Sequence, residues 1–168
     1  MRSKIKSLVI ASLLAALVCV ATMIIKIPTP LNGYVNLGDC VVLLAGWILS
    51  PGYGFLAAAI GSALADLFSG YAAYAPATFV IKGAVALVAF VCLKLMNKRI
   101  GRLASQIIGA VLAELLMVAG YFVFEGFLYG FAPSAVNIPA NAVQGIAGVI
   151  IGVVFVKIFD KIYPNGLS

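Results

Sequence analysis

Polar and ionisable side chains recur at helical spacing inside segments that are otherwise apolar. The carboxyl groups of Asp66 and Glu114 and the ammonium group of Lys82 are the most strongly polar of them. Such groups are costly to bury in apolar surroundings, so each indicates a functional site or a buried ion pair, such as one between Lys82 and Glu114. Four helical faces carry these groups: Ser62, Asp66 and Ser69; Thr78 and Lys82; Glu114, Tyr121 and Glu125; and Asn137, Asn141 and Gln144.

These residue types suit recognition of a small molecule better than catalysis. Amides and carboxylates hydrogen-bond to polar ring substituents, and tyrosines offer stacking faces with hydroxyls, so a flat, polar, ring-containing ligand is expected. The chain has no histidine, GxSxG sequence, P-loop or Cys/His cluster, so we expect no enzyme activity, cofactor or metal. Two structural alternatives stay open: hydrogen bonds between helices for the amides and hydroxyls, and membrane-interface anchoring for the aromatic residues.

The composition indicates which elements must position these side chains. Of the 168 residues, 64% are hydrophobic and 10% are charged, whereas a soluble domain carries roughly 25% charged residues. We therefore expect an all-α integral membrane protein. It forms a single domain over residues 1–168, because no linker rich in serine, glycine or charge divides the chain.

Six segments are candidates for membrane-spanning helices, which need roughly 20 apolar residues each. They cover about residues 5–25, 38–50, 54–69, 76–96, 103–125 and 135–159. The second and third are shorter than the others and are separated by the helix breakers of Ser50-Pro51-Gly52. The loops at about 26–37, 70–75 and 126–134 contain Gly, Pro, Tyr and Phe but little charge, and we expect them on the external side.

The basic residues indicate the orientation. Nine of the eleven lysines and arginines fall on one side of this six-helix arrangement: Arg2, Lys4, Lys6, Lys94, Lys98, Arg99, Arg102, Lys157 and Lys161. By the positive-inside rule, this side is cytoplasmic, and so are both termini. The placement of the basic residues on the cytoplasmic side thereby accounts for the net charge of +6, and nucleic acid is not an expected partner.

The polar faces concentrate in the outer half of the membrane. Glu114 lies twelve residues after Arg102, which places it roughly 18 Å along the helix. Glu125 and Asn137 flank the external end of the same region. The sequence therefore predicts one polar pocket, with the segment KIPTPLNGYVNLGD at 26–39 above it as a movable lid.

Two further features carry a family resemblance. Ala11 and Ala15 form an AxxxA motif on the first helix, and the block 27–83 contains IPTP, GYVNLGD, LLAGWILSPGYGFLAAAIGSALADLFSGY and YAPATFVIKG. With the size and the basic cytoplasmic face, these resemble the substrate-binding S component of energy-coupling factor (ECF) vitamin transporters. The similar subfamily is loosely described as riboflavin-type and includes proteins assigned to pyridoxine and hydroxymethylpyrimidine.

The resemblance implies a function and partners. The protein is expected to bind a vitamin at the outer face of a prokaryotic plasma membrane, surrounded by lipid. It is expected to contact a transmembrane T component through Ala11 and Ala15 and to be powered by two cytoplasmic ATPases. Ring chemistry favours vitamin B6, with hydroxymethylpyrimidine and riboflavin as alternatives. Outside this class, a stand-alone secondary carrier and an intramembrane structural or enzyme subunit stay open.

Ten residues are the expected ligand contacts by position. They are Asn36 and Asp39 from the first external loop, Tyr71 and Tyr74 from the next, Thr78 and Lys82, Glu114 and Tyr121, and Asn141 and Gln144. Two of the acidic residues have alternative structural roles, since Asp66 is also placed to brace loop ends and Asp39 to cap the amino end of a helix.

Overall fold

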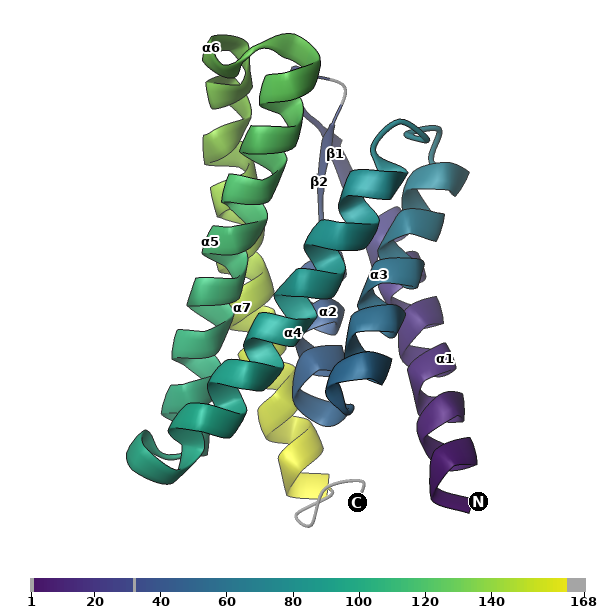
Figure 1. Ribbon diagram of the computed structural model, residues 1–168, viewed down its shortest axis with the longest axis vertical. Helices are drawn as coiled ribbons and strands as arrows, with labels where there is room; N and C mark the ends of the chain where they lie inside the picture. The colour runs from purple at the N-terminus through teal and green to yellow at the C-terminus, as the bar shows by residue number, and fades with distance from the viewer. Residues whose placement is uncertain (1, 32, 163–168) are drawn as a thin grey trace.

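The computed structural model describes residues 2–31 and 33–162, and six main helices make up most of that part of the chain. They are α1 (Arg2–Ile24), α2 (Gly38–Ile48), α3 (Pro51–Phe68), α4 (Ala75–Ile100), α5 (Arg102–Tyr129) and α7 (Ile138–Ile162) (Figure 1). Two short strands, β1 (Lys26–Pro28) and β2 (Tyr34–Asn36), lie between α1 and α2, and the short α6 (Phe131–Ser134) and η1 (Ala135–Asn137) precede α7. The predicted all-α membrane bundle is confirmed.

The central helix α2 is too short to cross a bilayer. Five stretches of helix in the described part of the chain are long and apolar enough to do so, and Gly38–Ile48 is a shorter apolar helix. Its 11 residues rise about 16 Å, roughly half of a hydrocarbon core. Every residue from Gly38 to Trp47 is buried, because α1, α3, α4 and α7 all pack against α2.

Four helices pack around α2, and small residues allow close contacts between helices. A Cβ atom on Gly46 of α2 would lie 2.3 Å from the carbonyl oxygen of Ala86 in α4. A Cβ atom on Gly61 of α3 would lie 2.4 Å from the carbonyl oxygen of Ala15 in α1. The outward faces are apolar, as expected for a surface in contact with lipid: the side chain of Phe127 is 80% exposed.

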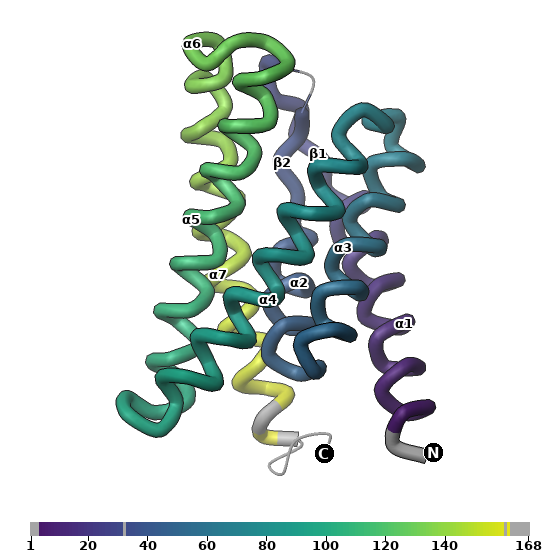
Figure 2. The backbone as a smooth tube through the Cα atoms, in the orientation of Figure 1, coloured from purple at the N-terminus to yellow at the C-terminus, as the bar shows by residue number. Residues whose placement is uncertain are grey.

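The strands form an antiparallel hairpin in the half of the bundle that α2 leaves unfilled (Figure 2). Lys26 pairs with Asn36 and Pro28 with Tyr34, and the Thr29 N–H donates to the Gly33 carbonyl across the turn (2.9 Å). The segment 26–37 is therefore more regular than the loop expected from sequence. β1 is exposed and β2 is partly buried. Cross-strand pairing satisfies backbone groups of β2 that would otherwise be costly in that position.

Several helices extend beyond the ranges expected from sequence. α4 continues to Ile100 and α5 to Tyr129, and most of the expected loop at 126–134 is helical. Apolar length sets only the part of a helix that lies in lipid, and a helix can continue into water until a stop signal occurs. Here the stops are Gly101 (φ 81°) and Gly130 (φ 92°), whose backbone conformation favours glycine.

The two ends of the bundle differ. α1 begins and α7 ends at one end, called the terminal end below, and the hairpin and α6 lie at the opposite one, called the hairpin end (Figure 1). This arrangement brings residues from distant parts of the sequence together beneath the hairpin.

Candidate functional site

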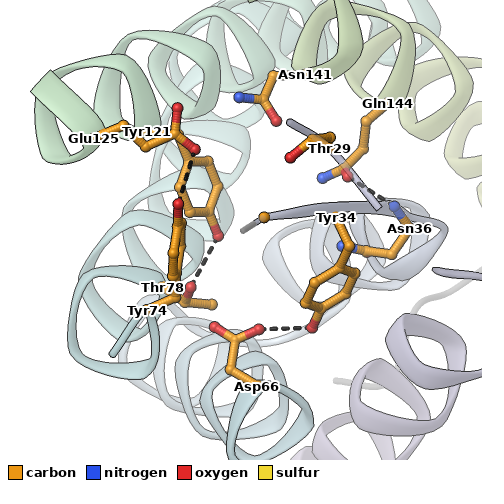
Figure 3. Close-up of a pocket in the computed structure, with 11 residues that line it drawn as sticks. Thr29, Tyr34, Asn36, Asp66, Tyr74, Thr78, Tyr121, Glu125, Asn141 and Gln144 are labelled. Atoms are coloured by element: carbon orange, nitrogen blue, oxygen red, sulfur yellow. Dashed lines mark hydrogen bonds between the residues drawn. The ribbon is translucent and has the colours of Figure 1, made fainter. Parts of the chain in front are cut away.

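A small polar cavity lies beneath the hairpin, between α3, α4, α5 and α7 (Figure 3). Its volume is about 30 Å³, which is enough to hold water but far below the roughly 300–1,000 Å³ of a pocket for a small organic ligand. Eleven residues line it: Thr29, Gly33, Tyr34, Asn36, Asp66, Tyr74, Thr78, Tyr121, Glu125, Asn141 and Gln144.

Tyrosine hydroxyls connect the hairpin to the helices around it. Tyr34 of β2 donates to Asp66 Oδ1 of α3 (2.6 Å), and its ring contacts that of Tyr71 at 4.6 Å between centroids. Tyr74, at the start of α4, donates to the Leu31 carbonyl (2.7 Å) and lies 3.3 Å from Glu125 Oε1.

Both tyrosines remain protonated donors at neutral pH. Burial raises the pKa of Tyr34 well above its usual value, and the neighbouring charge of Asp66 raises it further. Burial likewise raises the pKa of Tyr74, with a further contribution from Glu125. The hairpin is therefore attached to α3 and α4 by neutral hydroxyls.

A buried network forms the floor of the site at the start of α2. The Asn36 N–H donates to Gln144 Oε1 (2.8 Å), and Gln144 Nε2 donates to Asp39 Oδ2 (2.6 Å). Lys82 Nζ donates to Asp39 Oδ1 and forms an ion pair with it. Both carboxylate oxygens of Asp39 are thus satisfied by side chains of other helices, although Asp39 is completely buried.

This network corrects two expectations about charged residues. Lys82 pairs with Asp39 and not with Glu114. Asp39 does not cap α2, because it lies inside the first turn and bonds across helices; Asn36 Oδ1 instead accepts the Gly38 N–H (2.8 Å).

Glu114 lies apart from the cavity. It is 5% exposed, and neither carboxylate oxygen has a hydrogen-bond partner. Its side chain packs against the glycines Gly145 and Gly148 of α7, at the inner edge of an apolar groove between α5 and α7. Sequence spacing placed Glu114 on the same helical face as Tyr121 and Glu125, which line the cavity, but did not show that Glu114 itself lies outside the lining.

The opposite wall combines hydroxyls, amides and a carboxylate. Thr78 Oγ1 and Tyr121 Oη are 3.0 Å apart. Glu125 Oε1 accepts a hydrogen bond from Asn137 Nδ2 (3.0 Å). The Asn141 amide lies beside the cavity in Figure 3. Glu125 is only 2% exposed, although it lies near the hairpin end of α5.

Six of the ten expected ligand residues line the cavity: Asn36, Tyr74, Thr78, Tyr121, Asn141 and Gln144. Asp39, Lys82 and Glu114 lie below it, and Tyr71 lies behind Tyr34. The expected set omitted five lining residues: Thr29, Gly33, Tyr34, Asp66 and Glu125. Glu125 shares a helical face with the expected residues Glu114 and Tyr121, and Asp66 lies on the polar face of Ser62 and Ser69, so helical spacing indicated both acids. The hairpin residues had no periodic signal.

Metal binding has no support in the described ranges, where no three His, Cys, Asp or Glu side chains come close enough to hold an ion. Asp66 has the bracing role that was left open, through Tyr34, but its Oδ2 atom has no partner. The site therefore offers hydrogen-bonding groups and aromatic surfaces.

The alanines of the AxxxA motif lie at the contact between α1 and α3. Ala11 is 7% exposed and Ala15 is half-buried, with its carbonyl close to Gly61. Ser12 and Ala16, one residue further along, are exposed and line the same groove between α1 and α3. The small residues of α1 thus serve packing within the chain and also border an open surface.

Known proteins resemble this chain over most of its length. A sequence model of the family described as ECF-type riboflavin transporter, S component, matches residues 2–161. An uncharacterized protein in the gap 3′ region of Pyrococcus woesei is 35% identical over 136 residues, 80% of this chain and 88% of that protein. A solved structure of the S component of a bacterial ECF transporter has a TM-score of 0.77 and 26% identity, covering 95% of this chain and 98% of that chain.

Proposed function

Because the chain belongs to the family of S components of ECF-type riboflavin transporters, we propose that it binds a B-type vitamin or precursor with high affinity for uptake. It is a substrate-binding transporter subunit and not an enzyme, and we place it in the plasma membrane of a prokaryote. The cavity beneath the hairpin carries this proposal, because it gathers polar groups from four helices in an otherwise apolar bundle.

The hairpin is proposed as a lid. A cavity of about 30 Å³ is smaller than any vitamin, so a segment beside it must move to admit one. The hairpin is the best candidate, since side-chain bonds such as Tyr34–Asp66, Tyr74–Leu31 and the exposed Lys26–Ser69 bond hold it in place. Deleting residues 30–34 should speed ligand release in a stopped-flow assay and leave membrane insertion unchanged; unchanged release would make the hairpin a mere connector.

Vitamin B6 is the proposed substrate. Tyr34, Tyr74 and Tyr121 line the cavity and would offer aromatic faces to one flat ring once the hairpin has moved, and Asn141 and Gln144 supply amide groups beside them. Carboxylates such as Asp66 accept hydrogen bonds from hydroxymethyl groups. Hydroxymethylpyrimidine offers similar groups, and the description of the matching family favours riboflavin as a further alternative.

Ligand identification tests the substrate class directly. Native mass spectrometry of the protein purified from cells should detect a near-stoichiometric bound vitamin. Titration of ligand-free protein with pyridoxine, pyridoxal, hydroxymethylpyrimidine and riboflavin should then identify the tightest ligand. Absence of any bound B vitamin and of binding across the panel would overturn the proposed function.

The T component and two ATPases are the proposed partners, with α1 as the contact to the T component. Ala11→Trp plus Ala15→Trp should abolish co-purification with the T component, but these side chains would also press against α3. Ser12→Trp plus Ala16→Trp alters the exposed surface alone. If the Ser12→Trp/Ala16→Trp variant binds ligand but no longer assembles with the T component, the contact through α1 is supported. If both double variants assemble fully, that contact is excluded.

Reconstitution distinguishes this proposal from a stand-alone secondary carrier. Vesicles containing only this protein should accumulate no vitamin when an ion gradient is imposed. Addition of the T component and ATPases with ATP should start uptake. Uptake without these partners, driven by the gradient, would favour the carrier.

A further inference from the structure

Two carboxyl groups line the cavity, and neither forms an ion pair with a side chain in the described part of the chain. Asp66 of α3 and Glu125 of α5 lie on different walls and are 4% and 2% exposed. Each accepts from a neutral hydroxyl or amide through one oxygen, as Asp66 does from Tyr34. The other oxygens, Asp66 Oδ2 and Glu125 Oε2, are buried beside the cavity without a hydrogen-bond partner.

The charges of the described side chains inside the bundle do not balance. Four buried residues are acidic, Asp39, Asp66, Glu114 and Glu125, and Lys82 is the buried basic residue. Lys82 is paired with Asp39 below the cavity. Among the described residues that line the cavity, Asp66 and Glu125 are the charged ones. A buried carboxylate without a counter-charge is costly, so a positive group between these two acids would be stabilised.

Aromatic surfaces add to this preference. The hydroxyls of Tyr34 and Tyr74 are directed at protein acceptors, so their rings can contact a ligand through their faces or edges. Tyr121 lines the same space and already has Lys82 Nζ at 5.4 Å from its ring centroid. Cations are attracted to aromatic faces, and an anion would meet both the carboxylates and the negative ring faces.

We propose that this site selects a compact heterocycle that carries a positive charge, such as a protonated amine, and rejects phosphorylated or carboxylated forms of the same ring. The inference rests on the proposed function, since it assigns a charge class to the vitamin or precursor bound there. The two acids lie on different helices, so a ligand with hydrogen-bond donors at both ends satisfies both free oxygens.

A charge series on one ring tests the inference. Pyridoxamine, pyridoxine and 4-pyridoxic acid share the pyridine ring, and at neutral pH they are cationic, neutral and anionic overall. Calorimetry with purified protein should show pyridoxamine binding at least about tenfold tighter than pyridoxine, because one added charge pair in a partly desolvated site is worth that much or more. The anionic acid should show no measurable binding.

Isosteric variants identify the residues responsible. Asp66→Asn and Glu125→Gln remove charge at nearly constant shape, and each should reduce the pyridoxamine-to-pyridoxine affinity ratio several-fold. Asp160→Asn removes the same charge from the end of α7, far along the chain from Asn141 and Gln144, and should leave the ratio unchanged. If one variant fails to fold, as judged by its thermal transition, the other still decides, since they lie on separate helices.

The outcomes separate the inference from the function on which it rests. Equal affinity for the three charge forms, or an unchanged ratio in both pocket variants, overturns the charge selection and leaves vitamin binding intact. Lack of binding by the whole series together with hydroxymethylpyrimidine and riboflavin overturns the proposed function, and the inference with it.

Discussion

At the scale of single residues, the site depends on side chains that hold one another in place across helices. Asp39 illustrates this, because it receives Lys82 and Gln144 from two different helices, and Gln144 in turn receives the backbone of Asn36. Residue types and spacing were sufficient to predict a polar pocket between these helices. They were not sufficient to predict which carboxylate Lys82 pairs with, because pairing depends on the relative height of two packed helices.

The hydroxyl of Tyr34 is predicted to set the lifetime of the bound state. Tyr34→Phe removes the hydrogen bond to Asp66 and leaves that carboxylate without its donor. A hydrogen bond to a charged group contributes about 1.5–3 kcal/mol, so ligand release should be at least about tenfold faster. Stopped-flow release measures this. Tyr53→Phe, at the start of α3, is the matched control, and equal release rates in both variants would contradict the prediction.

Asp39 and Lys82 are predicted to depend on each other for the stability of the fold. Lys82→Met leaves a buried carboxylate without its cation and should lower the free energy of unfolding by about 3–5 kcal/mol. The double variant with Asp39→Asn should recover a large part of that loss. Thermal unfolding in detergent compares the variants.

Lys98→Met, at an exposed position of α4, provides the control for losing a lysine in general. Additive losses in the double variant would show that the two residues contribute independently.

At the scale of elements, the arrangement of helices was largely predictable and their ends were not. Apolar length and helix breakers indicated six helices, and the turn after α2 was visible in Ser50-Pro51-Gly52. The hairpin was not predicted, because its pairing joins residues such as Lys26 and Asn36 that show no periodic pattern. A segment that lies beside the core needs hydrogen-bond partners for its backbone N–H and C=O groups, and the pairing of the two strands supplies them.

The contact between α1 and α3 is predicted to require a glycine. Gly61→Ala places a Cβ atom 2.4 Å from the Ala15 carbonyl and 2.8 Å from Val18 Cβ. Overpacking of this kind should destabilise the protein by about 1–3 kcal/mol, seen as a lower midpoint of thermal unfolding.

Gly52→Ala is the matched control in the same helix, because nothing lies within 4 Å of its added Cβ. The control should be neutral or stabilising by up to about 1 kcal/mol, since alanine is the better helix former. An equal loss in both variants would show that the close contact is not the cause.

At the scale of the whole molecule, the polar groups are inside and the apolar groups are outside. Leu13 and Phe127 are 67% and 80% exposed, whereas Asp39 and Gln144 are 0% and 3% exposed. The number of main helices is even, so the start of α1 and the end of α7 lie at the same end of the bundle (Figure 1). The basic residues predict that this end is cytoplasmic, which the bundle alone does not determine.

Labelling of single cysteines tests that orientation. With the natural cysteines replaced by alanine, Ala73→Cys in the α3–α4 loop should react with a membrane-impermeant maleimide in intact cells. Lys98→Cys, near the terminal end of α4, should react only after permeabilisation. Both positions are exposed, so the reversed pattern would place the hairpin end in the cytoplasm.

The short length of α2 also determines where the membrane potential drops along the molecule. If the lid opens, water reaches the start of α2, and the remaining apolar barrier is about 16 Å thick rather than about 30 Å. The voltage then drops mainly across α2, below Asn36. A charged ligand that arrives at the floor has crossed little of the field, so its binding should be nearly independent of membrane potential. The electrical work, about 2.3 kcal/mol per charge for each 100 mV, falls on the later step that carries it past α2.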